Sequence, residues 1–189
     1  MTNALIFLIT TFSNLFCIAL FLRAWIFWRR ISPFNNPYCT FIYQITDFIV
    51  VPVRKIIPSS KYLDFPSLLI AYLVGLLQTV LNLLIASTGL FFTLAPFIPI
   101  YAVLVFFDNL LSLVLWLSLF YAVMSWISPI SPLQNFLRTL IEPILTPIRQ
   151  MLPNPLKKGP FDFSLLFLMI IIIALQMILK SAYKINIPL

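Results

Sequence analysis

Long runs of apolar residues alternate along this chain with shorter segments that carry most of its charge. A helix needs about 20 apolar residues to cross the roughly 30 Å hydrocarbon core of a bilayer. Four runs are long enough, and they predict transmembrane helices over about residues 4–28, 65–86, 103–127 and 163–183. A fifth run, 89–100, is short and contains Pro96 and Pro99, so we assign it to the connection between the second and third helices.

The segments inside each pair of runs have a helical period of their own. Apolar residues recur on one face of 136–148, and 41–57 repeats the pattern. Pro52, Pro143 and Pro147 are expected to break or restart these helices. A basic amphipathic helix beside a membrane lies in the interface. The alternative is a re-entrant segment, which needs other protein to cover its backbone groups.

The chain also repeats itself. The sequence ITDFIVVPVRKIIP (45–58) matches LIEPILTPIRQMLP (140–153) at an offset of 95 residues, and further matches at an offset of 98 lie on both sides. The repeat predicts an all-α polytopic membrane protein with two tandem helix–amphipathic loop–helix units. We place the first unit at 1–88, an uncharged connection at 89–102 and the second unit at 103–189. Each unit has two spans, so the copies should be parallel, with a pseudo-two-fold axis along the membrane normal.

Composition agrees with a membrane protein. Of the 189 residues, 62% are hydrophobic and 9% are charged, whereas a soluble domain carries roughly 25% charged residues. The first apolar run has no basic segment before it and no small-residue cleavage site after it, so we expect a retained span and not a signal peptide.

Charge sets the expected orientation. The chain has 12 Lys and Arg against 5 Asp and Glu, and most of the cations lie in 29–64 and 128–162, whereas 87–107 has no charge. The excess of Lys and Arg in short loops predicts that both basic segments face the cytoplasm and both termini the opposite side of the inner membrane, although Lys180 and Lys184 oppose this assignment mildly. Anionic lipid headgroups are the expected counter-charge, not nucleic acid; an acidic cytoplasmic partner is the alternative. The lipid-facing candidates are Arg29, Arg30, Lys55, Lys157 and Lys158.

An enzymatic function is not indicated. The chain has no histidine, and it contains no Ser–His, Cys–His or metal-ligand arrangement and no glycine-rich phosphate loop. We therefore predict a non-enzymatic protein without catalytic residues, metal ligands or cofactor.

Polar residues related by the repeat are the candidate functional positions. Asp64 and Asp162 each precede a span, so they are interpreted as helix N-caps, with a paired cation or proton site as the alternative; a bond from either to Arg54 or Arg149 is compatible with the cap. Gln78 and Gln176 are expected to form hydrogen bonds between helices, in the first unit within a stripe of small and polar residues. A polar pathway for ions would use the same face.

Three further positions have two interpretations each. Arg23 lies inside the first run and is expected to extend to the headgroups; the alternative is a buried ion pair with Asp47 or Asp64. Asp108 is expected at the outer end of the third helix as a cap or rim residue, but it would lie well inside the bilayer if that helix began near Phe97. Trp126, like Trp25 and Trp28, is interpreted as an interfacial anchor.

These motifs resemble the bacterial YggT family. The resemblance rests on Thr46-Asp47, PVRKIIP (52–58) and Asp64 in the first unit, and on MSWISP (124–129), EPILTPIRQMLP (142–153) and DFS (162–164) in the second. The first unit departs from the pattern with Phe48 where the second has Pro143, and the second has Tyr121-Ala122 in the region of Leu22-Arg23. The candidate repeat-motif residues are Asp47, Arg54, Pro58, Asp64, Gln78, Trp126, Glu142, Pro143, Arg149, Pro153, Asp162 and Gln176.

The resemblance implies a small multi-spanning inner-membrane protein linked to osmotic-stress tolerance or ion homeostasis. It also implies an alternative, a membrane scaffold or assembly factor for cell-division, envelope or cytochrome complexes. Either role admits a homo-oligomer or other membrane proteins as partners. Loss of Gln78 and Gln176 should disturb a conductor, whereas loss of charge at Arg54 and Arg149 should disturb a scaffold.

Overall fold

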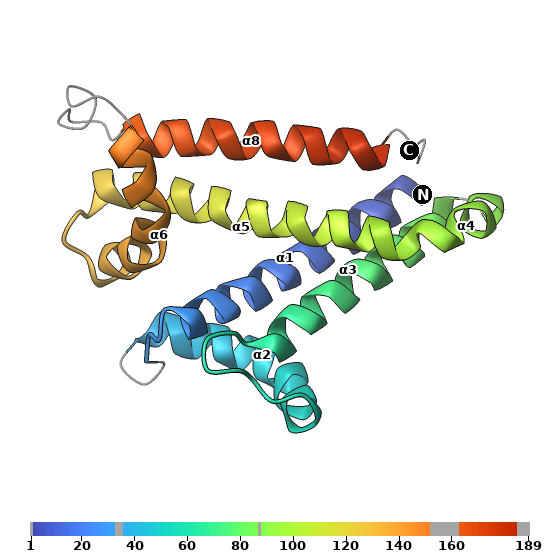
Figure 1. The fold of residues 1–189 in the computed structure, drawn as a ribbon, viewed down its shortest axis with the longest axis horizontal. Helices are drawn as coiled ribbons and strands as arrows, with labels where there is room; N and C mark the ends of the chain where they lie inside the picture. The colour runs from blue at the N-terminus through green and yellow to red at the C-terminus, as the bar shows by residue number, and fades with distance from the viewer. Residues whose placement is uncertain (1, 33–35, 87, 152–162, 185–189) are drawn as a thin grey trace. The chain divides into compact units, whose positions relative to one another are not determined.

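The computed structural model describes residues 2–32, 36–86, 88–151 and 163–184, and every regular element in these ranges is a helix (Figure 1). The elements, in chain order, are α1 (Thr2–Trp28), α2 (Pro37–Ile56), α3 (Phe65–Ala86), α4 (Thr88–Leu94), the short 3-10 helix η2 (Ala95–Phe97), α5 (Ile98–Ile127), α6 (Pro132–Met151) and α8 (Phe163–Lys184).

Four helical segments are long and apolar enough to cross a membrane: Thr2–Trp28, Phe65–Ala86, Phe91–Ile127 and Phe163–Ala182. Their number and positions confirm the predicted all-α fold with four spans. The chain is therefore a polytopic α-helical membrane protein.

The segment between the second and third spans differs from the prediction. It is helical, and α5 begins at Ile98 rather than near Val103. Pro96 lies in the first turn of η2 and Pro99 in the first turn of α5, where a helix does not need the N–H group that proline lacks. The two prolines therefore start helices here instead of interrupting them.

The expectation that prolines break the amphipathic segments was wrong. Pro52 lies inside α2, and Pro143 and Pro147 lie inside α6. A proline in a helix removes one hydrogen bond and leaves one carbonyl without its partner. Pro52 and Pro147 are on the exposed side of their helices, so we infer that water or headgroups can satisfy the freed carbonyls and the helix continues.

Local hydrogen bonds fix where α1 ends and where α2 begins. Arg30 adopts a left-handed backbone (φ 54°), and the amides of Arg30 and Ile31 donate to the carbonyls of Phe27 and Ile26, a Schellman motif that ends α1. Asn36 then caps α2, because its side chain accepts from the amide of Tyr38 (3.0 Å) and Pro37 occupies the first helical position.

By its contacts the chain divides into two compact units, residues 1–110 with 181–189 and residues 111–180. From here on, the first and second units are these two, whose bounds differ from those of the predicted repeats. In the first unit, α1 packs along α3, and α2 crosses the C-terminal end of α1 and the N-terminal end of α3 (Figure 1). A small residue allows α3 to approach α5, since a Cβ at Gly75 would lie 3.6 Å from the carbonyl oxygen of Ala102. In the second unit, α6 buries Leu140, Ile141 and Leu145.

The apolar surface of α2 is divided between two sides of the helix. Cys39, Ile42, Thr46 and Val50 are buried against the unit. In contrast, several apolar residues of the predicted apolar face are exposed, and Phe41 is the most exposed of them at 62%. Two apolar residues that do not belong to the predicted face, Phe48 and Ile56, are 70% and 82% exposed. Thus α2 presents one apolar side to the protein and another to its surroundings.

Candidate functional site

A group of four charged residues, of which Arg23 and Asp64 are buried and Asp47 and Arg54 are partly exposed, joins α1, α2 and the start of α3. We call Arg23, Asp47, Arg54 and Asp64 the ion cluster. Arg23 comes from the last two turns of α1, Asp47 and Arg54 from α2, and Asp64 directly precedes α3. Two arginines and two aspartates make the group neutral in sum, which is the condition under which charges are tolerated away from water.

Arg23 is at the centre of the ion cluster and is 1% exposed. Its Nη1 donates to the hydroxyl of Thr46 and to Oδ1 of Asp47, both at 2.7 Å, and its Nε lies 3.5 Å from Oδ2 of Asp64. The guanidinium also lies over the ring of Tyr43, 4.4 Å from its centroid, in a cation–π contact. One side chain of α1 therefore binds both α2 and the start of α3.

The snorkelling expected for Arg23 is therefore wrong, and the alternative ion pair is present with both aspartates that were considered. A snorkelling side chain keeps its charged end in water, whereas the Arg23 guanidinium is enclosed. The physical reason is that α2 lies across this end of α1. It places Thr46 and Asp47 within hydrogen-bond distance of the guanidinium, which therefore binds them instead of water.

Asp64 is fully buried, and its carboxylate accepts three side-chain hydrogen bonds. Ser59 and Arg54 Nη2 donate to Oδ1 at 2.7 and 2.9 Å, and Ser67 donates to Oδ2 at 2.7 Å. The carbonyl of Asp64 accepts from the amide of Leu68 (3.2 Å), as at the start of a helix. Asp64 thus occupies the predicted N-cap position and also makes the predicted bond to Arg54.

The surroundings of Asp64 favour its charged form. Burial by itself raises the pKa of this carboxyl, but the hydrogen bonds from Ser67, Ser59 and Arg54 and the positive charge of Arg54 lower it, and the net shift is downward. The ion cluster consequently holds Asp64 as a carboxylate at neutral pH and does not offer it as a proton donor.

The second unit uses the repeat-related residues in another way. Arg149 Nη1 donates to Oε1 of Glu142 at 2.6 Å, and Arg138 lies 3.9 Å from the other oxygen. The matching residues of the first unit, Asp47 and Arg54, do not pair with each other: Asp47 pairs with Arg23, and Arg54 pairs with Asp64. The difference follows from Arg23, since the second unit has Tyr121 and Ala122 in the corresponding region and so has no central cation to bind Glu142.

Several polar side chains of the spans form hydrogen bonds between helices, as predicted for Gln176, but no such bond is seen for the side-chain oxygen of Gln78 among the described residues. Asn82 donates to Thr10 of α1 at 3.1 Å, the thiol of Cys17 lies 3.6 Å from the carbonyl of Ala71, and Gln176 donates to Ser112 at 2.8 Å within the second unit. Gln78 is buried in α3, and its side-chain oxygen has no hydrogen-bond partner in the described part of the chain.

Asp108 lies deeper than first expected. Because α5 begins at Ile98, Asp108 is ten residues into the helix, or about 15 Å along its axis. The cap interpretation is therefore wrong, because Asp108 lies inside a continuous helix that begins near Phe97, as in the stated alternative. Its neighbour Asn109 is 2% exposed.

The remaining candidates lie outside the ion cluster. Pro58 is exposed just after α2, Pro143 lies in α6, and Trp126 is 70% exposed near the end of α5. Arg29, Arg30 and Lys55 are exposed. Pro153, Lys157, Lys158 and Asp162 lie outside the residues that the structure describes.

Three neutral residues that complete the site, Tyr43, Ser59 and Ser67, were not singled out from the sequence, and Thr46 was noted only as part of the Thr46-Asp47 motif. A weak signal existed for Ser67, which follows Asp64 by three residues, the spacing of side-chain pairs at a helix start. Among the described residues, no group of three or more Cys, Asp or Glu is arranged to hold a metal ion. Each charged residue of the ion cluster is paired with an opposite charge, although Nε of Arg23 and Nε of Arg54 have no hydrogen-bond partner among the described residues.

The fold and site define a polytopic membrane protein whose first three helices are joined by internal ion pairs. The sequence model of the family described as CCB3/YggT matches residues 2–85 and again residues 90–183. The chain therefore belongs to the CCB3/YggT family.

Similar proteins occur in several bacteria. The chain is 32% identical over 176 residues to "Uncharacterized protein YggT" of Escherichia coli K12, covering 93% of this chain and 88% of the relative. It is 35% identical to "Uncharacterized protein in proC 3'region" of Vibrio alginolyticus, covering 89% of both, and 31% identical to "Uncharacterized protein" of Haemophilus influenzae, covering 86% and 84%. No solved structure matches the chain.

Proposed function

We propose that this protein is a non-enzymatic component of the inner membrane that acts as a scaffold or assembly factor for other membrane proteins. The observation that carries the proposal is the closed ion cluster, in which each charged group has an opposite charge within 3.5 Å. Hydrogen bonds between helices use further polar groups of the spans. This use of polar groups supports a rigid, lipid-embedded body more than a site that exchanges ions. Other membrane proteins or a second copy of the chain are the proposed partners.

A second candidate is a direct role in ion homeostasis, and with it a contribution to osmotic-stress tolerance. It is supported by the side-chain oxygen of Gln78 and the side-chain nitrogen of Asn109, which are buried in the first unit without hydrogen-bond partners among the described residues. Unpaired polar atoms inside a span are where an ion or water would make contact.

Ion flux in proteoliposomes separates the two candidates. We expect the purified full chain to leave potassium and sodium flux at the level of empty liposomes, because both carboxylates of the ion cluster are bound by arginines and are not free to bind a cation. Folding is verified in the same liposomes by circular dichroism. A flux that exceeds the empty control and falls in Gln78→Leu, but not in the exposed control Leu77→Ala, would show conduction and refute the scaffold proposal.

We further propose that the chain arose as a duplicated unit with its basic amphipathic helices at the cytoplasmic face and its termini on the opposite side. The two separate matches to one family model support the duplication. The exposed apolar side of α2, beside the exposed Lys55, supports an interfacial position for that helix.

Thiol labelling tests this orientation. Cys17 and Cys39 are both buried and would be replaced by serine. Single cysteines would then be introduced as Lys61→Cys, between α2 and α3, and Asn3→Cys, near the start of α1; both positions are exposed. We expect a membrane-impermeant maleimide to label Asn3→Cys in intact spheroplasts and Lys61→Cys only in inverted vesicles. The reverse pattern would overturn the orientation.

A further inference from the structure

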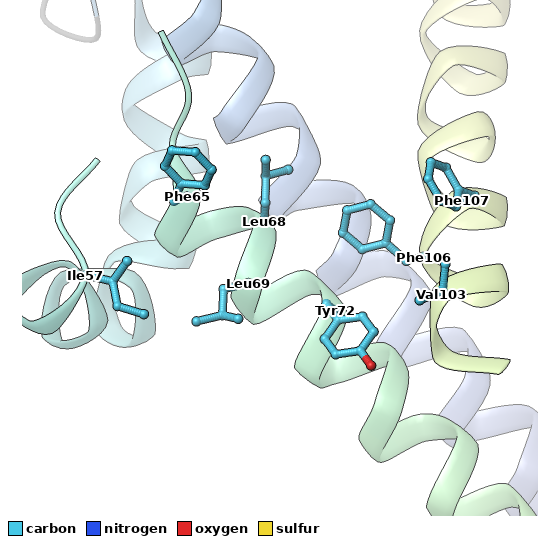
Figure 2. Close-up of a pocket in the computed structure, with 8 residues that line it drawn as sticks. All are labelled: Ile57, Phe65, Leu68, Leu69, Tyr72, Val103, Phe106 and Phe107. Atoms are coloured by element: carbon cyan, nitrogen blue, oxygen red, sulfur yellow. The ribbon is translucent and has the colours of Figure 1, made fainter. Parts of the chain in front are cut away.

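An apolar groove lies on the first unit between α3 and α5. It is lined by Phe65, Leu68, Leu69 and Tyr72 of α3 and by Val103 and Phe106 of α5 (Figure 2). We call it the α3–α5 groove. Its volume is about 470 Å³, within the range of roughly 300–1,000 Å³ that is typical of ligand sites.

The chemistry of the groove suits a hydrocarbon chain. All the lining residues except Ile57 belong to two segments that are apolar enough to span a membrane. Leu69 and Val103 are 37% and 41% exposed, so the groove opens to the surroundings of the protein. Water would find few polar partners there, whereas a hydrocarbon chain would restore the dispersion contacts that an unfilled groove lacks.

One end of the α3–α5 groove is close to positive charge. Ile57, the C-cap residue of α2, lines this end together with Phe65 in the first turn of α3 (Figure 2). Lys55 precedes Ile57 by two residues, Lys61 precedes Phe65 by four, and both lysines are exposed. The acids of the ion cluster are bound by arginines. Among the described residues, neither lysine is in an ion pair, and Lys61 Nζ lies 5.9 Å from the ring centroid of Tyr62.

We propose that the α3–α5 groove binds one acyl chain of an anionic phospholipid whose phosphate lies against Lys55 and Lys61. The groove supplies contact for the chain, and the two lysines select for a negatively charged headgroup. This assignment is independent of the role of the protein as a scaffold or in ion handling.

Native mass spectrometry of the full chain in detergent tests the proposal. We expect one phosphatidylglycerol to bind more tightly than phosphatidylcholine with the same acyl chains. Leu69→Trp fills the groove and should weaken phosphatidylglycerol binding about tenfold, whereas Leu73→Trp, one turn further along α3 and outside the groove, should change it less than about twofold. Neutralising Lys55 and Lys61 to glutamine should weaken it roughly fivefold for each charge and remove the preference for the anionic lipid.

Three results would overturn the proposal. Equal binding of the two lipids by the wild type would mean annular lipid without headgroup selection. Equal effects of Leu69→Trp and Leu73→Trp would place the lipid elsewhere. A second copy of the chain, bound in place of lipid and lost in Leu69→Trp, would make the groove a protein interface. If Leu69→Trp does not fold, Val103→Trp replaces it, because it fills the same groove from an exposed position on α5.

Discussion

Replacing Arg23 by methionine is expected to lower the free energy of unfolding by roughly 3–5 kcal/mol, the usual loss when one partner is removed from a buried ion pair. Methionine keeps much of the volume of the side chain and removes its charge. Thr46 and Asp47 then lose donors at 2.7 Å, and Asp64 remains buried beside Arg54 alone. The measurement is unfolding by SDS in dodecylmaltoside micelles, followed by circular dichroism.

The matched control for this change is Arg29→Met in the turn that follows α1. Arg29 is exposed, and surface substitutions of this kind usually change stability by no more than about 0.5 kcal/mol. The loss of unfolding free energy in Arg23→Lys should lie between those of Arg23→Met and Arg29→Met. Lysine keeps the positive charge but lacks the planar guanidinium that contacts α2 and the start of α3 together. If Arg23→Met is as stable as Arg29→Met, the ion cluster does not hold the three helices together.

The second large effect is expected for Asp64→Asn, which should lower the free energy of unfolding by about 3 kcal/mol at neutral pH. The amide has nearly the shape of the carboxylate but no charge, so Arg54 loses its buried partner at 2.9 Å and Arg23 loses one of its two. Thermal unfolding and SDS titration of the purified variants measure the loss.

The stability difference between wild type and Asp64→Asn should depend on pH. Because the pKa of Asp64 is lowered from the ordinary value of 3.8 in the folded protein, the folded state binds fewer protons than the unfolded state near that pH. The contribution of Asp64 is therefore fully present above the ordinary value and is lost as pH falls through the lowered pKa. The stability difference between wild type and Asp64→Asn should be constant from neutral pH to about pH 5 and should shrink below about pH 4.

Glu142→Gln is the matched control for Asp64→Asn, since it removes a repeat-related carboxylate from the second unit. Glu142 and Arg149 are 35% and 31% exposed, and partly exposed pairs contribute up to about 1 kcal/mol. A loss in Glu142→Gln as large as that in Asp64→Asn would mean that burial does not govern the strength of these pairs. A pH-independent difference between wild type and Asp64→Asn would contradict the carboxylate form of Asp64 in the folded protein.

The spans were predictable because their signal is local. A run of about 20 apolar residues has the length and composition of a transmembrane helix. The helix α3 has the bounds that its apolar run predicts. The start of α5 and the continuity of α2 and α6 were less predictable. Both Pro52 and Pro99 are prolines within an apolar segment, yet Pro52 lies inside α2 and Pro99 lies in the first turn of α5. The tertiary surroundings of each segment decide between these two outcomes.

The sequence by itself determined a lipid-embedded helical protein, the positions of its spans and the residues repeated between its halves, because each follows from composition and from spacing along one segment. The tertiary structure alone decided which charges meet. Arg23 is a single cation in an apolar run, and nothing within that run distinguishes a side chain that extends to water from one that is enclosed. The crossing of α2 over the ends of α1 and α3 brings Thr46, Asp47 and Asp64 within reach of its guanidinium, and a distance between segments is not encoded in the pattern of either one.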